Sequence, residues 1–192
     1  MRIKIYKNTL LAVILFGFLQ VNGQKRFDLT INGTSLDLDG ESLTGFGSEF
    51  DFTRDEVRKG WWKYARQFGS PLDMRTYYEV TIPAAASDGN VDLLVFAQTI
   101  EEGGKTLFKI GLKEEKYKTQ AKELLRVFKK DFYIQFYLAE LKLKELAAQK
   151  YSSQYETALQ EEEKSAALTL LNSTKQEMEF LKEEIRKVEQ KK

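Results

Sequence analysis

The stretch from Phe132 to Leu143, FYIQFYLAELKL, decides the fold because nine of its twelve residues are apolar. Around it, apolar residues recur at steps of three and four from Leu125 to Leu146, which is the spacing of an α-helix. A helix that is apolar around most of its circumference must be covered on more than one side. We expect one side to pack on a sheet, and another to meet a further helix, a second copy of the chain or an apolar ligand.

The sequence that follows is also typical of helix. All twelve glycines and both prolines lie at or before Gly111, and the remaining 81 residues contain neither. Near the C-terminus, apolar residues occupy two alternating heptad positions, which predicts a coiled coil of about three repeats. The first position holds Leu171, Met178 and Ile185, and the second holds Thr174, Leu181 and Val188.

A turn inside this helical region is expected at Lys150–Ser153. Ser153 and Glu156 have the spacing of a capping box, which opens a helix by satisfying its first backbone N–H groups. Because no glycine accompanies this signal, the alternative is one uninterrupted helix, which would reach ~120 Å over its 81 residues. Residues 114–192 are therefore predicted to form a helical hairpin or a coiled-coil stalk.

Residues 24–113 alternate apolar and polar side chains, which predicts an antiparallel sheet of about five strands. Asn32-Gly33 is expected to form a hairpin turn, and residues 40–47 a loop. The pattern over 53–68 predicts one covering helix, which a Thr53–Glu56 capping box opens. The predicted class is α+β, with the long helical region packing partly on the sheet.

Residues 1–23 have the three-part pattern of a secretory signal peptide. Arg2, Lys4 and Lys7 precede ten uncharged residues at 10–19, and small side chains stand before Gln24. Ten residues span only ~15 Å as a helix, which is half of a bilayer core. We therefore expect an exported protein of the periplasm or the extracellular space, of a bacterial envelope type, with no transmembrane span after signal removal.

The composition excludes several function classes. The chain has 30 basic and 29 acidic residues and contains neither histidine nor cysteine. Without these two residue types there is no disulfide, no Cys/His zinc site, no thiolate nucleophile and no histidine-based triad. The near-neutral charge argues against a nucleic-acid partner, because such binding is driven by neutralising phosphates. No cofactor or metal is expected, and the chain is expected not to be an enzyme.

Two groups of residues are candidates for contacts with a partner. Trp62 falls off the apolar face of the 53–68 helix beside Arg58, so the pair is a candidate interaction patch, with burial beneath a loop as the alternative. The tail supplies the second group, which consists of Phe132, Phe136, Leu171, Met178, Leu181 and Ile185.

Three carboxylates at Asp37, Asp39 and Glu41 alternate, so an extended strand would place them on one face. Such oxygens are suited to a hard cation or, together with Glu49 or Asp51, to glycoside cleavage. The competing interpretation, which we favour, is a solvated edge that discourages strand pairing.

These observations favour a non-catalytic exported cell-envelope protein that acts through protein–protein contacts or self-association of its helical tail. The alternative is a module that binds an apolar small molecule or lipid between the sheet and the long helix, an arrangement that resembles helix-grip ligand binders in its layers. Its expected walls are Phe96, Phe108, Phe128, Phe132 and Phe136. A carboxylate-dependent hydrolase is a remote third alternative.

Overall fold

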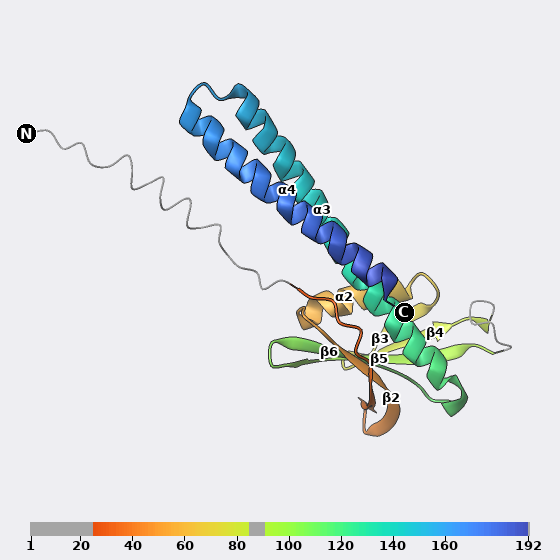
Figure 1. Ribbon diagram of the computed structural model, residues 1–192. Helices are drawn as coiled ribbons and strands as arrows, with labels where there is room; N and C mark the ends of the chain where they lie inside the picture. Colours follow the sequence, from red (N-terminus) through yellow and green to blue (C-terminus); the bar gives the residue numbers. More distant parts are fainter. Residues whose placement is uncertain (1–24, 85–90, 192) are drawn as a thin grey trace, which may run out of the picture.

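The computed structural model describes residues 25–84 and 91–191, so the predicted signal peptide lies outside the described residues. One antiparallel sheet is covered on one face by two helices, and a long helical hairpin projects beyond it (Figure 1). The predicted α+β class is confirmed.

Within the described residues the sheet has six strands in the order β1-β2-β6-β5-β4-β3, all paired antiparallel. The strands are β1 (Asn32–Leu38), β2 (Glu41–Phe50), β3 (Ser70–Asp73), β4 (Tyr78–Ile82), β5 (Leu93–Glu102) and β6 (Lys105–Leu112). Two of these strands were not predicted, β2 and β3, while residues 25–31, whose apolar residues alternate, form no strand. Strand β3 is a four-residue edge strand that contains Pro71. Proline is tolerated at an edge, and a strand this short has too little alternation to be recognised from sequence.

The first hairpin differs from the prediction. Asn32-Gly33 begins β1 instead of turning, and the turn lies at Asp39-Gly40, where φ is +55° and +96°. Asp-Gly suits a turn in which both central residues have positive φ. The predicted loop at 40–47 is part of strand β2. Glycine is required at position 45 because β2 and β6 approach closely there, and a Cβ would overlap the Ile110 carbonyl oxygen.

Helix α2 (Arg54–Ala65) begins as its capping box predicts. The Thr53 hydroxyl accepts a hydrogen bond from the Glu56 backbone N–H at 3.3 Å, and the Glu56 carboxylate accepts one from the Thr53 N–H at 2.8 Å. Val57, Trp61 and Ala65 are fully buried against the sheet. These three residues are spaced by four, so they lie on one face of α2, and this face packs across β5 and β6.

The helical region is a hairpin of α3 (Lys118–Thr157) and α4 (Glu161–Gln190), preceded by the short 3₁₀ helix η2 (Glu115–Tyr117). The predicted turn at Lys150–Ser153 is wrong, because those residues continue α3 and the chain reverses at Ala158–Gln160. The two helices run antiparallel, and the Lys130 ammonium at the base donates to the Glu189 and Lys191 carbonyls at 3.2 and 2.9 Å.

The heptad residues of α4 face α3 of the same chain. Leu171, Thr174, Leu181 and Val188 are buried, while Met178 and Ile185 are partly buried. The seven-residue repeat therefore describes packing inside one hairpin, since α3 supplies the opposing apolar surface.

We predict that Gly45→Ala lowers the free energy of unfolding by about 2 kcal/mol or more, because the added methyl has no room against the β6 backbone. Gly33→Ala, in the same hairpin, is the matched control, since a Cβ there meets nothing within 4 Å. Urea denaturation of both variants measures the difference. Equal stability of the two would contradict the close approach of β2 to β6.

Candidate functional site

The apolar stretch of α3 is covered by its own chain on three sides near the sheet. Phe132 and Phe136 pack edge-on against Phe52, with ring centroids 4.8 and 4.9 Å away. The segment 25–31 lies on a second side, where the Tyr137 hydroxyl donates to the Lys25 carbonyl at 2.8 Å. Helix α4 covers the third side. Of the partners expected for this stretch, a further helix is therefore present within the chain.

The outer half of the hairpin leaves leucines bare, and we call these the stalk leucines. Leu143 follows Phe136 by seven residues, so it lies on the same side of α3 as Phe136. At that height the sheet no longer covers this side of the helix, so Leu143 is 59% exposed. Leu146 is 55% exposed. The stalk leucines are Leu138, Leu143, Leu146, Leu168, Leu170 and, at the tip with 95% exposure, Leu159.

The six predicted contact residues of the tail are already packed. Leu171 and Leu181 are buried, and Met178 and Ile185 are partly buried on the side of α4 that faces α3. Phe132 and Phe136 are partly buried against the sheet domain. These side chains hold the hairpin together, and their role in a contact with another molecule stays a prediction.

Trp62 and Arg58 also have partners within the chain. The Trp62 ring lies 5.7 Å from that of Tyr78 and is partly buried. The Arg58 guanidinium donates to the Tyr78 hydroxyl at 3.2 Å, to the Arg75 carbonyl at 3.0 Å and to both carboxylate oxygens of Asp73 at 3.0 and 3.1 Å. The pair therefore ties α2 to the β3–β4 hairpin, and its use as an interaction patch stays a prediction.

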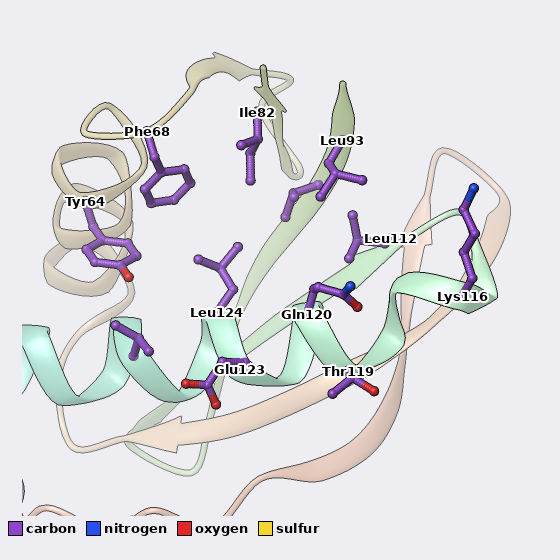
Figure 2. A pocket seen from close by; sticks show the side chains of 12 residues that line it. Tyr64, Phe68, Ile82, Leu93, Leu112, Lys116, Thr119, Gln120, Glu123 and Leu124 are labelled. Atoms are coloured by element: carbon purple, nitrogen blue, oxygen red, sulfur yellow. The ribbon is translucent and has the colours of Figure 1, made fainter. Parts of the chain in front are cut away.

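A groove of about 650 Å³ opens between the end of α2, strands β4 to β6 and the first turns of α3 (Figure 2). Apolar side chains form most of its wall, and polar ones are confined almost entirely to α3. The apolar residues are Tyr64, Phe68, Ile82, Leu93, Val95, Leu112, Leu124 and Val127, and the polar residues are Lys116, Thr119, Gln120 and Glu123.

The phenylalanines expected as the walls of a ligand site do not line this groove. Phe108 and Phe128 are fully buried and pack on each other at 4.9 Å. Phe96 lies in a separate cluster with Leu36, Leu38 and Tyr77, where the β1–β2 hairpin covers the other face of the sheet. Aromatic content alone did not separate residues that fill a core from residues that border a space.

Sequence reasoning missed a buried amine at Lys129, which is 1% exposed. Its ammonium donates to the Ser48 hydroxyl at 2.8 Å, and that hydroxyl donates to the Thr30 carbonyl at 2.6 Å. Burial lowers the pKa of Lys129 to about 8, although the carboxylates of Asp28, Asp51 and Glu49 favour the charged form. The missed signal was spacing, since residue 129 falls four residues after Leu125 and four before Tyr133 on the buried side.

The Ser48–Lys129 pair has the elements of a serine nucleophile and an amine base. Both side chains are enclosed, with exposures of 2% and 1%. In this structure the pair anchors the segment 25–31 through Thr30.

The alternating carboxylates do not converge. Asp37 accepts from the Gly40 N–H at 2.9 Å, Asp39 from the Tyr77 hydroxyl at 3.4 Å, and Glu41 lies 3.8 Å from the Lys113 ammonium. In the part of the chain that the structure describes, no three histidine, cysteine or acidic residues are grouped to hold a metal ion.

Across residues 25–84 and 91–191, none of the helices combines the length and the apolar character that crossing a bilayer requires. Comparison with family models, with curated proteins and with solved structures finds no match to this chain.

We predict that Lys129→Met raises the free energy of unfolding at neutral pH by about 1 to 3 kcal/mol, because it removes the cost of a buried charge. In the parent chain the unfolded state binds more protons than the folded state between the folded pKa of about 8 and the ordinary 10.5. Stability should therefore rise by about 2 kcal/mol between about pH 7 and about pH 9.5. The variant should lack this rise.

Urea-induced unfolding of the parent chain and the variant, across this pH range, measures the change in the free energy of unfolding. Above about pH 10 the trend should reverse, because burial raises the pKa of Tyr64 and Tyr137 to about 12, and their ionisation is easier in the unfolded state. A variant that keeps the same rise would show that Lys129 does not titrate as its burial implies.

Proposed function

We propose that this protein is a non-catalytic exported protein of the cell envelope that acts through contacts of its α3–α4 hairpin. The observation that carries the proposal is the exposure of the stalk leucines on a hairpin that projects beyond the sheet (Figure 1). Exposed leucines gathered on one projecting element favour protein association, because burying them removes apolar surface from water. Export rests on the pattern of residues 1–23 alone.

The stalk leucines favour a second copy of the chain as the partner. In the outer half of α3, residues 138–157 carry three basic and three acidic side chains, so two copies of this surface can meet without net repulsion. A symmetric contact of this kind buries the stalk leucines of both copies in a four-helix assembly.

One ion pair links the two helices within a copy. The Lys144 ammonium of α3 pairs with the Glu177 carboxylate of α4. Between copies, such exposed pairs set orientation more than strength, since each contributes at most about 1 kcal/mol. The leucines supply most of the free energy of association.

We predict that Leu143→Glu combined with Leu146→Glu weakens self-association at least about tenfold, because each charge must be desolvated at the contact. Sedimentation equilibrium of the chain from Gln24 at several concentrations measures it. Leu72→Glu is the matched control, since Leu72 is 57% exposed but lies on β3, away from the hairpin. A chain that remains monomeric at every concentration would refute the second copy as the partner.

A further inference from the structure

We propose that the groove beside α3 is a binding site for a neutral, elongated apolar molecule that carries a hydroxyl or carbonyl group at one end. This site lies on the sheet domain, apart from the stalk leucines, so the inference goes beyond the proposed function. Its volume of about 650 Å³ is within the range that small-molecule sites occupy.

The groove exists because two helices diverge over one face of the sheet. Helix α2 packs mainly on β5 and β6, and α3 packs mainly on β2 and β6. Between the end of α2 and the start of α3, the inner sides of Val95 and Leu112 therefore face a space instead of a third helix. Figure 2 shows Phe68, Ile82, Leu93 and Leu124 around the same space. Ile82, Leu93, Val95 and Leu112 form a floor that is at most 7% exposed, so an apolar body placed there would remove from water mainly the partly buried Phe68 and Leu124.

The charges of the wall are already neutralised, which selects a neutral ligand. The Lys116 ammonium pairs with the Glu114 carboxylate at 2.8 Å. The Glu123 carboxylate accepts from the Arg126 guanidinium at 2.7 Å. An anionic head group would have to displace Glu114 from Lys116, and a cationic one would have to displace Arg126 from Glu123. Neither exchange gains the free energy of a new ion pair.

The polar group that remains free points to a hydroxyl or carbonyl on the ligand. Within the described residues, the exposed side chain of Gln120 forms no hydrogen bond and lines the groove from the first turns of α3, whereas Figure 2 shows Thr119 pointing away from Leu112. Figure 2 shows Gln120 next to Leu112, at the same end as Lys116. An amide both donates and accepts, so it suits a neutral oxygen, and the apolar remainder of the ligand then extends toward Tyr64 and Phe68.

The chain contains a reporter for this site. Trp61 is fully buried, and its ring lies 6.0 Å from that of Tyr64 and 6.5 Å from that of Phe68, both of which border the groove. Occupation of the groove should change the indole environment through these two rings. Trp62, the other tryptophan of the sequence, packs on Tyr78 instead.

The test is a titration of the full chain, as recovered from its host, with the neutral fluorescent probe N-phenyl-1-naphthylamine. We expect saturable binding, a change in tryptophan emission, and displacement of the probe by monoolein at least about fivefold more effectively than by oleate. These two lipids share an acyl chain and differ in head-group charge. Absence of binding would overturn the site, and equal or stronger displacement by oleate would overturn the neutral class.

Three variants locate the binding. Leu124→Trp fills the groove and should weaken probe binding at least about tenfold, whereas Leu143→Trp makes the same change on the stalk and should leave it within about twofold. Gln120→Leu lies at an exposed position that tolerates substitution. It should weaken the binding of monoolein about threefold or more and leave the affinity for the probe unchanged. Equal effects of the two tryptophan variants would place the binding elsewhere.

The same variants separate this inference from the proposed function. Leu143→Glu with Leu146→Glu should weaken self-association at least about tenfold and keep probe binding. Gln120→Leu should keep self-association and lose monoolein selectivity. A groove that binds nothing in a chain that still dimerises refutes the ligand site alone.

Discussion

The structure depends on the packing of α3 against the end of β2. Phe128 and Phe132 of the helix meet Phe50 at centroid distances of 5.6 and 5.5 Å, and Phe132 meets Phe52 at 4.8 Å. These large side chains bury much apolar area and prefer such edge-on and tilted contacts. Because they fix one end of a 40-residue helix on the sheet, the other end has to project. The stalk and its bare leucines follow from that geometry.

The same placement also creates the groove. Helix α3 is held over β2 and β6 by the aromatic contacts, and α2 is held over β5 and β6 by Trp61 and Val57. The two helices therefore diverge over β5, where the buried Val95 forms part of the floor of the groove. One packing arrangement thus produces two surfaces of different character, the groove on the sheet domain and the exposed stalk leucines on the hairpin.

Local signals predicted well those elements whose stabilising contacts lie within a few residues. The Thr53–Glu56 capping box opened α2 as expected, because both of its hydrogen bonds close within four residues. The position of the first hairpin turn and the roles of Gly33 and Gly45 were predicted wrongly. Asn32-Gly33 has the local chemistry of a turn, but Gly45 must lie against β6, more than 60 residues away, and that contact sets the register. Lys129 was missed because its burial depends on Ser48 and the segment 25–31.

By itself the sequence determined the α+β class, the boundary near Gly111, the helical character of the region after it and the need for the Phe132–Leu143 stretch to be covered on more than one side. These follow from composition and periodicity, which act locally along the chain. Only the tertiary structure decided that α4 and residues 25–31 supply that cover, that the turn lies at Ala158–Gln160, and that the groove is bordered by Leu112 and Leu124 and not by the phenylalanines. The physical reason is that burial is a property of how distant segments meet, and periodicity shows only that a face must be buried, not what buries it.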